Sequence, residues 1–310
     1  MKKIVLAENL AVSSVALGAM NFGTTTSKED AFRVLDAYVD MGGNFVDTSN
    51  NYAHWAGVGD ESEKVLGEWF ASRKNRDKIV LATKVGFDRK GVGAGLRKEQ
   101  IEYWIDESLK NLRTDFVDIY YAHVDDKNTP LEETLSAFDS LVKKGKVRIL
   151  GGSNYDTWRF AEANMLAQQK GLTPYSIMQK RFTYLHTKGE VAPKYEFNET
   201  VDRECMRFLK DKKIPLVAYS SLAKGGYENK ERLPVDTLVD GRYDMIKQMA
   251  NDKGVSASAL AVAWMCNLSS CGYTDVIPLF ASSKVEHFVD NLKGAFMSLT
   301  KEEMDTLNKA

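Results

Sequence analysis

A short apolar run with a polar end occupies residues 42–52, Gly42-Gly43-Asn44-Phe45-Val46-Asp47-Thr48-Ser49-Asn50-Asn51-Tyr52. The run predicts a strand that buries Phe45 and Val46. Asp47 and Tyr52 are then expected where the sheet ends and solvent or a ligand begins, a position at which binding and catalytic residues gather. The stretch therefore predicts a buried strand with a functional site at its end.

Strand patterns like this one alternate with helical patterns along the whole chain. Before it, Thr26-Ser27-Lys28-Glu29 has the form of a capping box, and the apolar residues that follow recur at helical spacing until Gly42. A helical pattern also follows each later strand pattern. The expected strands are 14–18, the run ending at Asp47, 79–84, 117–123, 147–150, 175–179, 216–219 and 275–279.

Strands separated by helices pair in parallel through right-handed crossovers, and eight such units in about 300 residues is the size of a closed barrel. We therefore expect an α/β fold, a (β/α)8 TIM barrel, with an N-terminal hairpin in residues 3–12. No Pro, Gly and Ser linker interrupts the pattern, so residues 1–310 are expected to form a single domain. The alternative, a doubly wound open sheet, normally carries a Gly-rich phosphate turn after its first strand. The near match at 91–96 lies in the third unit and is interpreted as a loop.

Composition narrows the class of partner. The chain has 310 residues, and its 42 basic and 43 acidic residues are intermixed, which gives no electrostatic footprint for nucleic acid or an anionic membrane. Its three cysteines form no C-x-x-C pair, so neither a disulfide framework nor a metal site is expected. No apolar stretch approaches ~18 residues and no signal-length run opens the chain. We expect a cytoplasmic protein with a small-molecule partner; the sequence does not indicate its oligomeric state.

Four polar residues close neighbouring strands of the expected barrel. Asp47 and Tyr52 follow the second strand, Lys84 closes the third and His123 closes the fourth. In a barrel the carboxyl ends of the strands carry the chemistry, so these side chains are expected to converge there. Taken singly, each also fits an ordinary surface or core position, and their order along adjacent strands is what favours a site.

Three spaced motifs resemble those of the aldo-keto reductase superfamily: Asp-Thr-x-x-x-Tyr from Asp47, Ala-Thr-Lys from Ala82 and Asp-x-Tyr-x-x-His from Asp118. The resemblance runs essentially end to end, through segments 17–20, 59–67, 152–155, 218–222 and 277–291. It implies an NAD(P)H-dependent oxidoreductase that reversibly reduces an aldehyde, ketone or sugar carbonyl to an alcohol.

The resemblance also implies the cofactor contacts. Ser153, Asn154 and Gln179 would hold the nicotinamide carboxamide, and Tyr219 would stack on the ring. Ser282, Ser283 and Lys284 suit the 2′-phosphate of NADP(H), which we favour over NAD(H). His287 lies where many relatives carry an arginine. The implied contacts are Gly18, Met20, Asp47, Ser153, Asn154, Gln179, Tyr219, Ser220, Leu222, Ser282, Ser283, Lys284, His287 and Asn291.

The four strand-end residues then acquire catalytic roles. Hydride delivery builds negative charge on the carbonyl oxygen, which a positioned proton donor must neutralise; Tyr52 is the expected donor. Lys84 would favour the phenolate and lower the pKa of Tyr52, and Asp47 would hold the ammonium. His123 would donate a hydrogen bond to the substrate oxygen.

Substrate contacts are expected from variable loops. Trp55, His123 and Tyr184 are the expected lining of the pocket, and Tyr195 and Tyr227 are further candidates that could equally be packing aromatics. The residues beyond His123, Asp125-Asp126-Lys127, would suit a sugar, so the substrate class stays open.

Two other functions fit parts of the pattern. Relatives of this fold include slow, cofactor-binding regulatory subunits of membrane channels, and a lysine at a strand end such as Lys84 also serves Schiff-base enzymes. The complete set of four residues favours the reductase.

Overall fold

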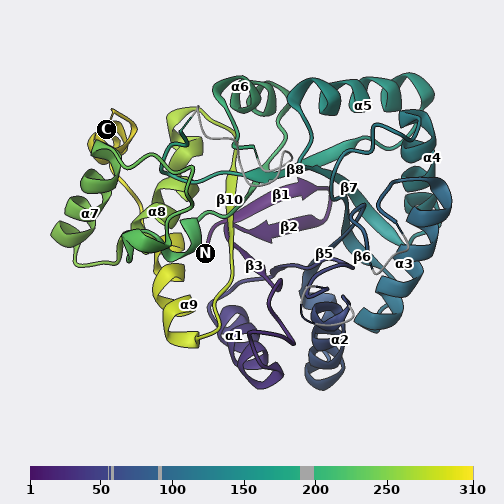
Figure 1. Ribbon diagram of the computed structural model, residues 1–310, viewed down its shortest axis with the longest axis horizontal. Helices are drawn as coiled ribbons and strands as arrows, with labels where there is room; N and C mark the ends of the chain where they lie inside the picture. Colours follow the sequence, from purple (N-terminus) through teal and green to yellow (C-terminus); the bar gives the residue numbers. More distant parts are fainter. Residues whose placement is uncertain (55, 57–58, 90–92, 189–198, 310) are drawn as a thin grey trace.

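The computed structural model describes residues 1–54, 56, 59–89, 93–188 and 199–309. Its central feature is a closed barrel of eight parallel strands in the order β10-β3-β4-β5-β6-β7-β8-β9, with helices around the outside (Figure 1). The expected (β/α)8 barrel is confirmed. The barrel strands are β3 (Ala16–Gly18), β4 (Phe45–Asp47), β5 (Val80–Val85), β6 (Val117–Ala122), β7 (Val147–Ser153), β8 (Tyr175–Arg181), β9 (Leu216–Tyr219) and β10 (Val276–Phe280).

Helices follow the strands as the alternating pattern predicted. They are α1 (Lys28–Asp40), α2 (Glu61–Arg73), α3 (Lys98–Leu112), α4 (Leu131–Lys143), α5 (Thr157–Lys170), α6 (Arg203–Lys212), α7 (Gly241–Lys253), α8 (Ala257–Asn267), α9 (Val285–Leu292) and α10 (Lys301–Lys309). Short 3-10 turns are η1 (Arg76–Lys78), η3 (Ala223–Gly225), η4 (Lys230–Arg232), η5 (Leu268–Cys271) and η6 (Lys293–Phe296).

The expected N-terminal hairpin is confirmed as well. Strands β1 (Lys3–Ala7) and β2 (Leu10–Ser13) pair antiparallel, and Figure 1 shows them across the centre of the ring. Ile4, Leu10 and Val12 pack in the same apolar cluster as inward-facing barrel residues such as Phe45. The hairpin therefore closes the end of the barrel opposite the strand ends that carry the polar residues.

Tyr38 of α1 fixes where β4 begins. Its hydroxyl donates to the carbonyl oxygen of Val15 at 2.7 Å and accepts from the backbone nitrogen of Phe45 at 3.0 Å. A Cβ on Gly43 would lie 2.1 Å from the Tyr38 ring, so only glycine fits at this crossing. Strand β4 then pairs with both neighbours at its last residue, because Asp47 is level with Gly18 of β3 and Ala82 of β5.

Strand β7 runs three residues beyond the expected 147–150. The added residues include Gly151 and Gly152, whose low strand preference hid them in the sequence pattern. A Cβ on Gly151 would lie 2.4 Å from the Tyr121 ring, so glycine is required by close packing inside the barrel. This extension brings Ser153 to the same edge as Gln179.

Among the described residues, no single helix combines the length and apolar character needed to cross a membrane. Only the bent pair Gly241–Lys253 and Ala257–Cys271, with 100° between its halves, meets that length and composition together.

Candidate active site

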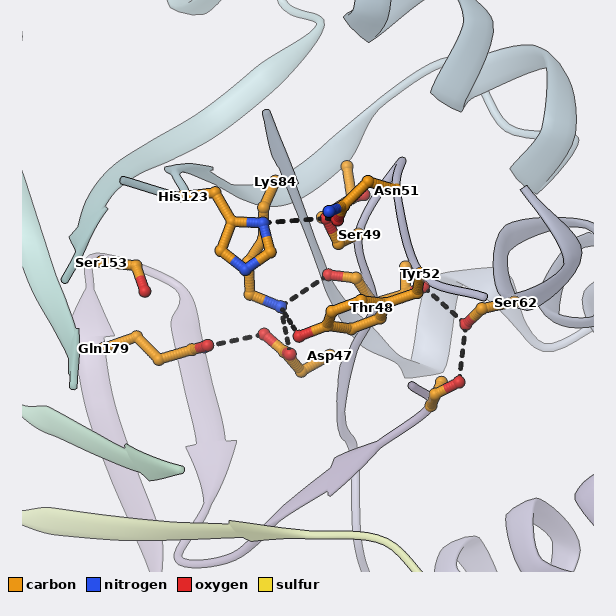
Figure 2. Close-up of polar contacts among 12 residues, drawn as sticks. Asp47, Thr48, Ser49, Asn51, Tyr52, Ser62, Lys84, His123, Ser153 and Gln179 are labelled. Carbon is orange, nitrogen blue, oxygen red and sulfur yellow. Dashed lines mark hydrogen bonds and ion pairs between the residues drawn. The ribbon is translucent and has the colours of Figure 1, made fainter. Parts of the chain in front are cut away.

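Asp47, Lys84, Tyr52 and His123 lie together at the carboxyl ends of β4, β5 and β6 (Figure 2). The Nζ atom of Lys84 is the hub: it bonds the carboxylate of Asp47, and it donates to the carbonyl oxygen of Thr48 at 2.7 Å and to Oη of Tyr52 at 2.9 Å. Its three protons therefore have three acceptors, as a buried ammonium requires.

The Asp47–Lys84 pair is fully buried. Both residues are 0% exposed, and burial raises the pKa of Asp47 and lowers the pKa of Lys84, while their mutual attraction opposes both shifts. Removing one partner would leave the other charge uncompensated in the interior. The pair thus fixes the position of the ammonium beside Tyr52.

The pKa of Tyr52 lies well above its usual range because the phenol is buried, and the Asp47 carboxylate adds to the shift. The expectation that Lys84 lowers this pKa is therefore wrong for the protein as described. Burial is the larger cause, because the phenolate would lose its hydration, and the Asp47 carboxylate disfavours the phenolate as well. The consequence is a Tyr52 that stays protonated at neutral pH, with Lys84 donating to the oxygen on which negative charge would develop.

The ring of His123 is uncharged at neutral pH. Burial and the nearby Lys84 ammonium hold its pKa well below the usual range. Its Nδ1 atom lies 3.1 Å from Oγ of Ser49, and the Phe87 ring packs edge-on with a centroid distance of 4.5 Å. The ring therefore has a fixed orientation against Tyr52, whose centroid is 5.8 Å away.

Residues at the ends of β7, β8 and β9 form a polar rim beside this cluster. Gln179 donates from Nε2 to Asp47 Oδ2 at 2.9 Å, and the backbone nitrogen of Asn154 donates to the Gln179 carbonyl at 3.1 Å. The Asn154 amide donates to the His123 carbonyl (2.9 Å) and to Ser153 Oγ (3.1 Å), and it accepts from the Tyr219 hydroxyl at 2.7 Å. Asn154, which follows β7, thus links the ends of β6, β8 and β9.

This rim has the donor set that a nicotinamide carboxamide needs. A serine hydroxyl and a glutamine amide can each donate and accept, and Ser153 and Gln179 are level with each other at the ends of β7 and β8. The Tyr219 ring lies at the end of β9, where a flat cofactor ring could stack. The residues present therefore fit the group.

The expected phosphate-binding residues lie on neighbouring loops. Ser221 donates its hydroxyl to the Leu279 carbonyl at 2.9 Å and so ties the end of β9 to β10. Ser220 before it has a left-handed backbone, with φ of 55°. Lys284 is exposed and immediately precedes α9, whose N-terminus favours anions.

The comparisons with known proteins agree with this geometry. The family model for the aldo/keto reductase family matches residues 14–310. The chain belongs to the aldo/keto reductase family. The aldo-keto reductase ausK of Emericella nidulans is 31% identical, covering 96% of this chain and 77% of its own. Norsolorinic acid reductase stcV of the same organism is 31% identical (94% and 76%), and the putative aryl-alcohol dehydrogenase AAD14 of Saccharomyces cerevisiae is 29% identical (96% and 82%).

The remaining cofactor contacts expected from the aldo/keto reductase pattern are spread around the same end of the barrel. The loop after β3 is tied to β4, because the backbone nitrogen of Ala19 donates to the Asp47 carbonyl at 2.9 Å. The neighbouring Met20 is 44% exposed. Leu222 is buried. Ser282, Ser283, His287 and Asn291 lie with Lys284 in and before α9, and their ligand contacts stay predictions.

The residues predicted to line the substrate pocket differ in where they lie. Trp55 and Tyr195 lie outside the described residues. Tyr184 is 1% exposed, donates to the Leu307 carbonyl at 3.0 Å and packs edge-on against Trp264. Tyr227 is fully buried, with its hydroxyl 2.6 Å from that of Thr183. These contacts are packing contacts outside the catalytic cluster, so they give neither tyrosine a substrate role.

The acidic residues beyond His123 are engaged within the protein. Asp125 pairs with Arg159 at 3.2 Å. Asp126 accepts from the backbone of Leu96 and from the Thr129 hydroxyl, at 2.8 and 2.6 Å. Lys127 lies 3.5 Å from Asp156. The role of these three residues toward a sugar stays a prediction.

Sequence reasoning missed two residues of the site, Ser49 and Phe87. Both contact the His123 ring, Ser49 from the loop after β4 and Phe87 from the loop after β5. Their proximity to strand ends was a usable signal, since the loops that follow β4 and β5 lie at the end of the barrel that carries Asp47 and Lys84.

Proposed function

We propose that this chain is an NAD(P)H-dependent oxidoreductase that reversibly reduces an aldehyde or ketone to an alcohol, with Tyr52 as the proton donor. The contact that supports the proposal best is the 2.9 Å hydrogen bond from Lys84 to Tyr52. The Asp47 carboxylate also bonds the Lys84 ammonium and holds it in place. This arrangement places a protonated phenol beside a fixed positive charge at the mouth of the barrel.

In reduction, a bound nicotinamide supplies a hydride to the carbonyl carbon, and the rest of the step belongs to the protein. The proton of Tyr52 moves to the substrate oxygen as the carbonyl becomes an alcohol, and the phenolic oxygen takes up the negative charge. Lys84 already donates to that oxygen, so the charge forms beside a preorganised ammonium. In oxidation the same groups act in reverse, with the Tyr52 phenolate accepting the alcohol proton.

For the cofactor we favour NADP(H) over NAD(H). Lys284, Ser282 and Ser283 precede α9, where an ammonium, hydroxyls and backbone N–H groups suit a 2′-phosphate. The Asp290 carboxylate near His287 is paired with Lys293 at 2.9 Å, which reduces its repulsion of a phosphate.

For the substrate we favour an aromatic aldehyde or ketone. The Phe87 ring stands edge-on to His123, so an aromatic group bound beside His123 would find an apolar wall. Two relatives, a norsolorinic acid reductase and a putative aryl-alcohol dehydrogenase, are named for aromatic substrates and support the same class.

The test is a substrate panel followed by nicotinamide absorbance with both NADPH and NADH. The panel contains aryl aldehydes, aryl ketones, aliphatic aldehydes and sugars, and also the matching alcohols with the oxidised cofactors. We expect turnover that is highest with an aryl carbonyl. Cofactor binding without turnover on any carbonyl would reject the proposed function.

A further inference from the structure

A hydrogen-bonded chain of three side chains runs from the substrate side of the site into its wall. Oγ of Ser49 lies 3.1 Å from Nδ1 of His123, and the same Oγ donates to Oδ1 of Asn51 at 2.8 Å (Figure 2). Ser49 is 0% exposed, Asn51 6% and His123 7%. The proton positions in this chain decide what His123 offers to a ligand.

A serine hydroxyl has one proton and two lone pairs. Since Ser49 donates that proton to Asn51, its oxygen can only accept at the contact with His123. The proton between Ser49 and His123 must then belong to Nδ1. The ring carries one proton, because burial and Lys84 hold its pKa well below the usual range. The second nitrogen, Nε2, is therefore left with a lone pair.

Nε2 is the ring atom available to a substrate. Within the described part of the chain it has no hydrogen-bond partner, whereas Nδ1 is occupied by Ser49. Figure 2 shows Ser49 and Asn51 on the Nδ1 side and the second nitrogen on the side of Lys84 and Tyr52. The tautomer thus determines whether the ring meets a ligand oxygen as donor or as acceptor.

We propose that Ser49 is a positioning residue that, held by Asn51, keeps His123 in the Nδ1–H tautomer and presents Nε2 to the ligand as an acceptor. What this means for the reaction rests on the proposed function. An alcohol hydroxyl donates directly to Nε2. A carbonyl oxygen needs a donor, so the Ser49 hydroxyl must turn from Asn51 to Nδ1. The ring then releases its Nδ1 proton to solvent water and takes up one proton from water at Nε2, with no net change in charge. The resting site is therefore set for the alcohol.

The tautomer is measured directly by NMR on protein labelled with ¹⁵N in its four histidines, with His123→Gln identifying the His123 signals. We expect the Nδ1–H form in the wild-type protein. Ser49→Ala removes the acceptor of the Nδ1 proton, and Asn51→Ala frees the Ser49 hydroxyl to donate to Nδ1. Both variants are expected to shift His123 to the Nε2–H form.

Ser62→Ala is the matched control. Its hydroxyl is equally buried and bonds Thr48 Oγ1 and the Ala19 carbonyl, both at 2.7 Å, but it does not contact His123. The control should keep the Nδ1–H form. Nε2–H in the wild-type protein, or Nδ1–H retained in both Ser49→Ala and Asn51→Ala, would overturn the proposal. Since these spectra need no turnover, an inactive protein would reject the proposed function without deciding the tautomer.

Ligand preference is the second readout. Dissociation constants of benzyl alcohol and benzaldehyde, as probes, are measured with the cofactor form that prevents turnover. Ser49→Ala should move their ratio about tenfold towards the aldehyde, the size of one hydrogen bond. A purely structural role would weaken both ligands alike, so an unchanged ratio would overturn the acceptor role of Nε2.

Discussion

Lys84 and Tyr52 are joined by a 2.9 Å hydrogen bond in which the ammonium donates to the phenolic oxygen. The other two ammonium protons go to the Asp47 carboxylate and the Thr48 carbonyl. No proton of Lys84 is left for a substrate, so the lysine acts on a substrate through Tyr52. Because only Tyr52 is proposed to contact the substrate, mutating Tyr52 and Lys84 one at a time distinguishes the contributions of the two residues.

Tyr52→Phe removes the proton donor and keeps the ring. We expect kcat for carbonyl reduction to fall by about a hundredfold to ten-thousandfold, the usual contribution of a positioned proton donor. Cofactor binding, followed by nicotinamide fluorescence, should survive. Tyr227→Phe is the control, because it deletes another buried tyrosine hydroxyl, bonded to Thr183, outside the cluster. Turnover by Tyr52→Phe at the wild-type rate would refute the assignment.

Lys84→Met leaves the Asp47 carboxylate buried without its partner. Breaking a buried ion pair in this way costs roughly 3–5 kcal/mol of the free energy of unfolding. Asp47→Asn combined with Lys84→Met removes both charges, so the double variant should be less destabilised than the sum of the single variants. Urea unfolding of the four proteins in a double-mutant cycle measures the coupling. Strictly additive losses would contradict the buried pair.

His123 should make stability fall in mild acid. Its pKa is 6.5 before folding and well below that in the folded protein, because burial and Lys84 disfavour the charged ring. Below 6.5 the unfolded chain binds a proton that the folded protein does not, so the free energy of unfolding falls by up to about 1.4 kcal/mol per pH unit. Above 6.5 the contribution is fully present.

Comparing urea unfolding of the wild type and His123→Gln across this pH range isolates the effect. The variant should show a shallower fall in stability on acidification, since glutamine does not titrate. Parallel pH profiles for the two proteins would show that the His123 pKa is not lowered on folding.

Lys284→Ala tests the cofactor preference. Losing one charge-assisted contact to a 2′-phosphate should raise KM for NADPH about tenfold and leave KM for NADH nearly unchanged. His287→Arg should act in the opposite direction by adding a guanidinium. Lys293→Ala is a matched control, because that ammonium is paired with Asp290. Equal effects of Lys284→Ala on both cofactors would argue against a phosphate contact.

The sequence by itself determined the barrel and the chain order of its site. Strand and helix periodicities are local properties, and eight alternations leave a closed parallel sheet as the compact solution. Because all barrel strands point the same way, Asp47, Lys84 and His123 had to meet at one end. The family motifs then assigned their expected roles, and the fold and the family membership are confirmed.

Tertiary structure decided what depends on neighbours distant in sequence. Burial reversed the expected pKa shift of Tyr52, since desolvation is a property of the packed site. Packing placed Tyr184 and Tyr227 in the interior, and the close approach of the Tyr121 and Ile177 side chains explains the glycine at position 151 of β7. The contact between Ser49 and His123 joins two loops that no local pattern connects, and it sets the proton positions of the site.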